Sequence, residues 1–422
     1  MRHRFFVRKT RSCVSVERSS DYTPIRYGDV LFAGSGETID EIGKSVACLL
    51  QGPACCGGDV VVFRPSVDVD AAFMGYAADS GPAILQKSRM GRGITVMHVY
   101  GDQLKSLCLA FPPVPEQAAI VRYLNFVDRR IRRCVRARNA LVKLLEEQKR
   151  ATLELVATGK LDVRTGRPYS AYKPSGVAWL GSVPEHWEVA RSRRLFTVRR
   201  ELARPGDQQL SATQAYGVIP QSEYEDRVGR RVVKLSMHFE KRRHVEKDDF
   251  VISMRSFQGG LERAWASGAI RSSYVILKPA PEVDVAFFSY VLKSPAYIRA
   301  LQSTGDFIRD GQDLTFGNFS RVDLPLPPLD EQGAIAQALR GILRGIETQI
   351  ATSQREVELL EEHWNRLVVD VINGTVDVRE AAAQLPDTIG EPEPFDDLDA
   401  LAEDDEADGE GDLDTALEEV EA

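Results

Sequence analysis

The sequence predicts an α+β protein with two mixed α/β globular domains, each followed by a long helix, and with the two helices paired as an antiparallel coiled coil. Three observations support this fold class. They are an internal repeat, apolar residues spaced three or four apart in both copies, and opposite net charges on the two helical segments. At 422 residues, 43% of them hydrophobic, the chain is long enough to form several apolar cores.

The internal repeat relates residues 111–164 to residues 326–379 at a constant offset of 215 positions, with 19 identities in 54 positions. Both copies contain Pro-Pro-x-x-Glu-Gln, Leu-Leu-Glu-Glu and Gly-x-x-Asp-Val-Arg, in that order. Upstream, residues 58–80 match residues 273–294, and each stretch predicts a strand, a turn and a helix with Phe73 or Phe287 inward. The repeat unit is therefore a globular segment plus a helix, present twice.

Domain boundaries follow from the repeat. We expect a first globular domain at 1–110, a long helix in 111–165, a second globular domain at 166–325, a second helix in 326–380 and a tail at 381–422. At the repeat offset Met1 aligns with Tyr216, so the first domain has no counterpart of about 45 residues that open the second. It is expected to be incomplete at its N-terminus.

Each helical segment spans roughly 44 residues, 115–158 and 330–373, or about 66 Å. The first holds ten basic and five acidic residues, and the second holds four and eight. A lone helix of this length would leave its apolar stripe uncovered, so each is expected to cover the other. Two unrelated helices in separate domains remain the alternative. The expected stripes are Ile120, Leu124, Val127, Ile131, Val135, Val142 and Leu145, and Ile335, Leu339, Ile342, Ile346, Ile350, Val357 and Leu360.

The net charge of −8 is unevenly distributed. Residues 391–422 contain 16 acidic residues and no Lys or Arg, which leaves 46 acidic and 54 basic residues in the rest of the chain. The acidic tail is expected to be disordered, and the basic remainder is compatible with nucleic-acid binding. The sequence has neither a membrane-length apolar run nor the apolar core of a secretory signal, which favours a cytoplasmic location.

Sequence motifs for catalysis are not found. The stretch 34–45 resembles a phosphate-binding loop, but Thr38 stands where the required Gly should be. The six cysteines form no Cys-x-x-Cys pair, and the histidines show no His-Glu-x-x-His spacing. We therefore expect neither a metal site nor an enzyme. An enzymatic function would need a catalytic cluster that motif search does not reveal.

The doubled motifs, together with the Gly-Ser-Val-Pro-Glu-His-Trp stretch at 181–187, resemble the specificity (S) subunits of Type I restriction–modification enzymes over about residues 1–380. The resemblance implies two target-recognition domains that each read one half of a bipartite DNA site, at a separation set by the coiled coil. It also implies that methylase subunits, two per S subunit, dock on the helices and that a motor-nuclease subunit joins for restriction. S-adenosylmethionine, ATP and Mg would belong to those partners, and this chain would hold no cofactor. The alternative is a degenerate or single-reader subunit that acts mainly as a coiled-coil scaffold without specific DNA binding.

Candidates for DNA contact are side chains that can reach base edges or phosphates. In the first domain they are Ser35, Glu37, Lys44, Lys87, Arg89 and Arg92. In the second domain they are Lys241, Arg242, Arg243, Arg255, Ser256 and Gln258.

Overall fold

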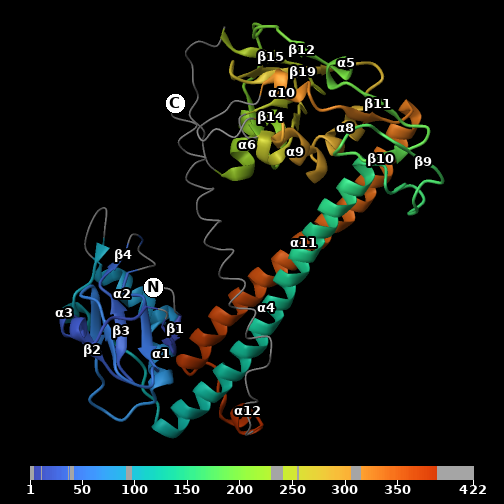
Figure 1. Ribbon diagram of the computed structural model, residues 1–422. Coiled ribbons are helices and arrows are strands. Elements are labelled where there is room, and N and C mark those ends of the chain that lie inside the picture. The colour runs from blue at the N-terminus through green and yellow to red at the C-terminus, as the bar shows by residue number, and fades with distance from the viewer. Residues whose placement is uncertain are drawn as a thin grey trace. The chain divides into compact units, whose positions relative to one another are not determined.

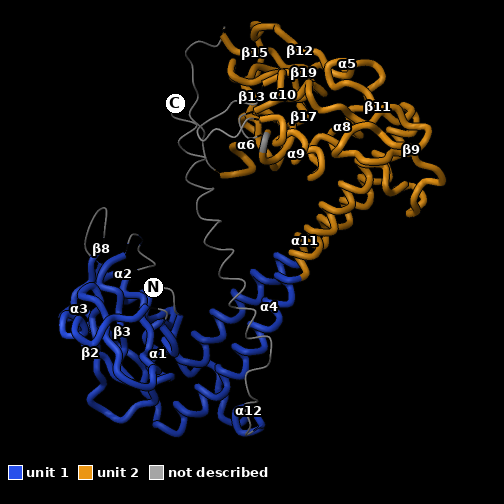
Figure 2. The backbone as a smooth tube through the Cα atoms, viewed as in Figure 1, with its two compact units in different colours: residues 1–140, 353–393 blue, residues 141–352, 394–422 orange. Residues whose placement is uncertain are grey.

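The computed structural model describes residues 4–10, 12–36, 38, 42–91, 97–229, 241–253, 256–305 and 315–386 (Figure 1). The chain forms two compact units (Figure 2). Unit 1 lies within residues 1–140 and 353–393, and unit 2 within residues 141–352 and 394–422. Each unit combines one globular segment with its own portion of two long helices.

Unit 1 is built on a four-stranded sheet in the order β1–β5–β3–β7, in which β1 is parallel to β5 and the other pairings are antiparallel. Two further antiparallel pairs, β2–β6 and β4–β8, flank it. The strands are β1 (Phe5–Val7), β2 (Thr23–Ile25), β3 (Val30–Ala33), β4 (Ser35–Gly36), β5 (Ser45–Cys48), β6 (Ala54–Cys56), β7 (Val60–Phe63) and β8 (Met97–His98). The helices are η1 (Glu17–Asp21), α1 (Ala71–Ala78), α2 (Gly81–Met90), α3 (Gly101–Leu104), α4 (Val114–Ala157) and, near the end of the described chain, α12 (Arg379–Ala383).

The core of this sheet follows the two-residue alternation of a strand. Val30 and Phe32, on one face of β3, belong to the apolar cluster that includes Met74 of α1. Leu31, between them, belongs to a second cluster on the other face. Phe73 is fully buried against the long helices, which confirms the strand, turn and inward-facing helix expected for this stretch.

Unit 2 contains a four-stranded antiparallel sheet in the order β12–β19–β16–β17. Four antiparallel pairs accompany it: β9–β10, β11–β20, β13–β14 and β15–β18. The strands are β9 (Tyr172–Pro174), β10 (Ser182–Pro184), β11 (Glu188–Ala190), β12 (Phe196–Arg199), β13 (Leu210–Thr213), β14 (Gly217–Pro220), β15 (Arg243–Val245), β16 (Phe250–Ile252), β17 (Glu262–Arg263), β18 (Gly268–Ile270), β19 (Val275–Pro279) and β20 (Leu324–Leu326). The helices are α5 (Ser192–Leu195), α6 (Gln221–Val228), α7 (Ser256–Gly259), α8 (Val285–Val291), α9 (Pro295–Gln302), α10 (Phe316–Phe319) and α11 (Leu329–Ile372).

The two sheets share a repeated strand pair, because β3–β7 of unit 1 corresponds to β16–β19 of unit 2. They differ at one edge. β19 also pairs with β12, whereas β7 has no second neighbour among the described strands. β12 lies in the stretch of the second segment that has no counterpart in the first at the repeat offset.

The two long helices pair, and they run antiparallel (Figure 1). In unit 1, Leu124 near the start of α4 shares a buried cluster with Val368 near the end of α11. In unit 2, Val156 at the end of α4 shares a cluster with Leu339 near the start of α11. Each helix has 44 residues, as the repeat predicted.

Charges across the helix pair are complementary in the predicted sense, with bases on α4 and acids on α11. Arg138 lies 2.6 Å from Glu356 in unit 1, and Lys149 lies 2.7 Å from Glu347 in unit 2. These ion pairs are partly exposed, so each contributes less than about 1 kcal/mol and they favour a register more than they stabilise the pair.

Three expectations need correction or limits. Ile342 is 41% exposed, and its neighbour Leu343 is buried instead, because the packed stripe drifts around the helix. The tail boundary at residue 381 is wrong, since Ala382 of α12 is buried and Arg122 donates a hydrogen bond to the carbonyl of Leu385. Residues 387–422, which include the acidic segment, lie outside the described residues.

Within the described part of the chain, no helix has both the length and the apolarity to cross a membrane.

Candidate nucleic-acid interface

Candidates for DNA contact in the first domain differ in accessibility. Arg89 is exposed near the end of α2, and Lys44 is half-buried. Ser35 of β4 donates a hydrogen bond to a carboxylate oxygen of Asp59 at 2.5 Å. Among the candidate cations that the structure describes in this domain, Arg89 is therefore the most accessible. Glu37 and Arg92 lie outside the described residues.

Lys87 is inaccessible to DNA, and its selection as a contact residue is wrong. Its side chain is fully buried, and Nζ donates to the carbonyl of Ala78 at 2.8 Å and to Oγ of Ser45 at 3.0 Å. Burial lowers the pKa of Lys87, an effect that Asp79, 3.4 Å away, partly offsets. Through its hydrogen bond to Ser45, this lysine connects α2 to β5 within the core.

In the second domain, Lys241 and Gln258 are exposed and Arg243 of β15 is half-buried. Arg242 is only 8% exposed, and burial, followed by the charge of Arg271, lowers its pKa. Its side chain is directed into the protein, so this candidate is also wrong as a direct contact.

Ser256 is a further correction. It is fully buried, and its Oγ accepts a hydrogen bond from the backbone N–H of Ser253 at 2.9 Å. It therefore shapes the entry to α7. Arg255 lies outside the described residues.

The structure brings Gln258 beside a turn that the sequence analysis did not single out, residues 213–217 between β13 and β14. The side chain of Gln214 lies against α7, because a Cβ at Gly259 would come 2.7 Å from its Cδ. On the other side of the turn, Trp265 lies so close to Gly217 that a Cβ there would come 2.8 Å from the indole Nε1. We call the residues Gln214, Tyr216, Gln258, Arg263 and Trp265 the turn surface.

An arginine guanidinium packs against each of the two aromatic rings of the turn surface. The guanidinium of Arg263 lies 4.3 Å from the centre of the Trp265 ring, and that of Arg227 lies 4.7 Å from the centre of the Tyr216 ring. Trp265 is nevertheless 51% exposed. Sequence reasoning missed it because a single Trp after a short strand carries no periodic signal.

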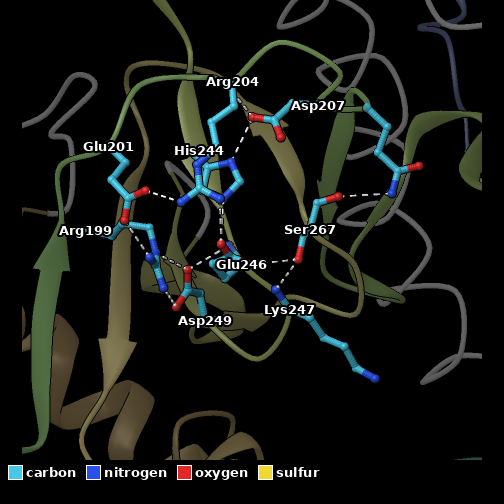
Figure 3. A network of polar contacts seen from close by, with 10 residues as sticks. Arg199, Glu201, Arg204, Asp207, His244, Glu246, Lys247, Asp249 and Ser267 are labelled. Carbon is cyan, nitrogen blue, oxygen red and sulfur yellow. Dashed lines mark hydrogen bonds and ion pairs between the residues drawn. The ribbon is translucent and has the colours of Figure 1, made fainter.

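Unit 2 also contains a polar network that joins β15 to residues 199–207 (Figure 3). His244 is 2% exposed, with Nδ1 2.8 Å from Asp207 and Nε2 2.9 Å from Glu246. Burial opposes a charged imidazole, but the two carboxylate hydrogen bonds outweigh it and raise the pKa of His244. The hydrogen bond with His244 is in turn the main reason that the pKa of Glu246 falls to about 2.

The same network continues to the sheet through Arg199 of β12. Its Nε and Nη2 donate to the two carboxylate oxygens of Asp249 at 2.7 and 3.0 Å, and Nη1 donates to Glu201 at 2.8 Å. Asp249 directly precedes β16, and Asp29, which directly precedes the corresponding strand β3 of unit 1, is held by Arg64 at 2.7 Å instead. These charged groups pair with one another, and the network therefore connects β12 and β15 within the domain.

The long helices are joined to the globular segments by the glutamine of each Pro-Pro-x-x-Glu-Gln motif. Gln117 accepts a hydrogen bond from the backbone N–H of Asp70 at 2.9 Å, and Gln332 accepts one from Asp284 at 2.8 Å. Both aspartates cap the helix that follows them, α1 or α8. The same hydrogen bond therefore connects the long helix to the globular segment in both copies of the motif.

The glutamate of the motif differs between the copies. Glu331 is 7% exposed and accepts hydrogen bonds from Arg164 at 2.9 Å and from the hydroxyl of Tyr169 at 2.9 Å. His186 lies 2.7 Å from its second oxygen. The repeat-related Glu116 is half-buried. In unit 2 the motif therefore ties α11 to the exit of α4 and to the Gly-Ser-Val-Pro-Glu-His-Trp stretch.

With this geometry described, the chain can be compared with known proteins. No family model matches the sequence. Over 294 residues it is 22% identical to a protein of Methanocaldococcus jannaschii provisionally named as the MjaX type I restriction enzyme specificity subunit. The chain is thus similar to a protein named as a Type I specificity subunit. The match covers 68% of this chain and 64% of that relative, just under two thirds of its length.

One solved structure supports the same fold. A chain from a study of complex assembly and conformational transition of the type I R-M system superposes with a TM-score of 0.62 at 17% identity, covering 84% of this chain and 83% of that one. The HsdS subunit of Thermoanaerobacter tengcongensis also matches, with a TM-score of 0.45 at 19% identity, covering 84% and 81%. Among the residues that the structure describes, no group of three or more His, Cys, Asp or Glu side chains is placed to hold a metal.

Proposed function

We propose that this chain is the DNA sequence-recognition subunit of a Type I restriction–modification complex and has no catalytic activity of its own. The observation that carries the proposal is the doubled unit, in which a globular segment is joined to an antiparallel helix by the same glutamine contact in each copy. Relatedness to Type I specificity subunits supports it. Each globular segment reads one half of a bipartite site, and the helix pair sets the spacing between the halves.

Methylase subunits dock on the helices in this proposal, two per chain, and a motor-nuclease subunit joins for restriction. Support comes from the Leu-Leu-Glu-Glu motif, whose first leucine is exposed in both copies, 62% at Leu144 and 47% at Leu359. The same exposed side chain at two repeat-related positions suits two copies of one partner. S-adenosylmethionine, ATP and Mg are held by the partners, and the complex acts in the cytoplasm.

A second candidate is a subunit with a single reader, which acts mainly as a scaffold. One observation favours it: among the described residues, the sheet of unit 1 has no counterpart of the edge strand β12. This alternative predicts methylation at one half-site only, or no sequence-specific methylation.

Co-expression with the cognate methylase, followed by base-resolved mapping of methylated adenines, tests the proposal. We expect a bipartite motif with a fixed spacer. A soluble complex that methylates no defined motif would contradict specific recognition, and a motif with one half-site would favour the single-reader alternative.

The role of the helices can be tested by adding one heptad to each, between residues 140 and 141 and between residues 352 and 353. Seven residues lengthen a helix by about 10 Å, which corresponds to about 3 base pairs. We expect the two half-sites to be retained and the spacer to lengthen. An unchanged spacer in an active complex would contradict the spacing role.

A further inference from the structure

The indole of Trp265 is both exposed and held in place, which is uncommon for an aromatic side chain on a surface. It is 51% exposed. One edge lies against the backbone of Gly217, where a Cβ would come 2.8 Å from Nε1 and 3.1 Å from Cδ1. Its face lies 4.3 Å from the guanidinium of Arg263. An apolar ring fixed in this way loses little conformational entropy on binding a ligand.

Arg263 is itself oriented by a residue in a strained conformation. Its Nε and Nη2 donate to Oδ1 of Asp248 at 2.9 and 2.6 Å. Asp248 has a φ of +73°, in the left-handed region that favours glycine. Asp248 lies two positions before β16, and the residue two positions before the corresponding strand β3 of unit 1 is Gly28, with a φ of +89°. Unit 2 therefore has a charged side chain where the other copy has the residue best suited to that backbone, and this side chain holds the Arg263 guanidinium over the Trp265 ring.

The surroundings of Trp265 are suited to nucleic-acid bases. The cations here are paired with carboxylates: Arg263 with Asp248, Arg227 with Glu223 at 2.6 Å, and Lys293 with Glu262 at 2.7 Å. This pairing reduces the attraction for phosphates. What the turn surface offers instead is the exposed ring of Trp265 and the exposed amide of Gln258. Amides pair with adenine edges, and apolar groups contact the thymine methyl or a base face.

We propose that Trp265 contacts a base of the half-site in duplex DNA that the second domain reads, and that Asp248 and Arg263 are positioning residues for its indole. The inference rests on the proposed function and goes further by naming the contact. Loss of the contact relaxes recognition at one or two positions of that half-site and leaves the other half-site unchanged.

The test uses the full chain co-expressed with its methylase, with base-resolved methylation mapping of Trp265→Ala, Trp265→Phe and Asp248→Gly. The control is Leu329→Ala, since Leu329 has nearly the same exposure, 52%, and lies at the start of α11. Asp248→Gly separates positioning from folding, because glycine suits the backbone but leaves Arg263 without its acceptor. Thermal unfolding of each variant shows whether it folds.

We expect Trp265→Ala and Asp248→Gly to lower discrimination at the same half-site by roughly 5- to 100-fold, the range for loss of a base contact. Trp265→Phe should retain most of it, Leu329→Ala should match the wild type, and Asp248→Gly should keep the wild-type melting temperature. An unchanged motif in folded Trp265→Ala and Asp248→Gly variants would overturn the inference and leave the proposed function standing. Loss of methylase co-purification with an unchanged motif would also overturn it, since the ring would then face a protein. If the wild type methylates no bipartite motif, the proposed function fails and the inference fails with it.

Discussion

Replacing Glu331 with Gln removes a buried charge that joins three separate segments of unit 2. The carboxylate accepts from Arg164 and Tyr169 and lies 2.7 Å from His186. Glutamine keeps the shape of the side chain but replaces one carboxylate oxygen with an N–H donor. The amide oxygen can still accept from Arg164 and Tyr169, but without the negative charge that strengthens both hydrogen bonds. The amide N–H then faces Nε2 of His186, which has to act as an acceptor instead of a donor.

The expected cost follows from the burial of each partner. A hydrogen bond to a charged group contributes about 1.5–3 kcal/mol. Arg164 and His186 have side chains that are 35% and 49% exposed, so solvent screening reduces their share. We therefore expect a loss of about 2 kcal/mol in the free energy of unfolding of unit 2, or a fall of roughly 4–8 °C in its melting temperature.

Hydrogen–deuterium exchange on peptides covering the start of α11, combined with thermal unfolding followed by tryptophan fluorescence, measures this loss. The matched control is Glu116→Gln, because Glu116 has the same place in the repeat but no side-chain hydrogen bond within the described residues. We expect the control to stay within about 0.5 kcal/mol of the wild type. Equal effects of the two substitutions would refute the reasoning.

Three further predictions concern the polar groups of both units. The folded protein raises the pKa of His244, so protonated His244 stabilises unit 2 at pH values below about 6.5, the ordinary pKa of histidine. The melting temperature should therefore fall as the pH rises above that value, and His244→Gln should remove this dependence. Burial raises the pKa of Glu262 to about 7, although the charge of Lys293 opposes this shift. The melting temperature should therefore also fall as the pH rises from about 4.5 to 7, and Glu262→Gln should remove this part of the pH dependence. Gln117→Ala and Gln332→Ala should each destabilise their own unit by about 1–3 kcal/mol, as measured by urea unfolding and local hydrogen exchange, because each leaves a backbone N–H without its acceptor. Any of these fails if the variant reproduces the wild-type profile.

Sequence by itself determined the two long helices and their pairing, because a stripe of apolar residues over 44 positions, present twice with opposite charges, has few ways to be buried. It also determined the strand–turn–helix units around Phe73 and Phe287, since local alternation and a capping aspartate act within a few residues. The repeat further located the stretch of the second segment without a counterpart in the first, and this stretch contains the edge strand β12.

Accessibility was decided only by the tertiary structure. Lys87, Arg242 and Ser256 looked available in the sequence, but packing between elements distant along the chain buries all three. Trp265 has no local signal, and it became a candidate because the fold places it against Gly217 and beneath the Arg263 guanidinium. Periodicity reports which face of an element is apolar, whereas burial of a single polar side chain depends on which partners the fold brings to it, and those partners are set by the whole chain.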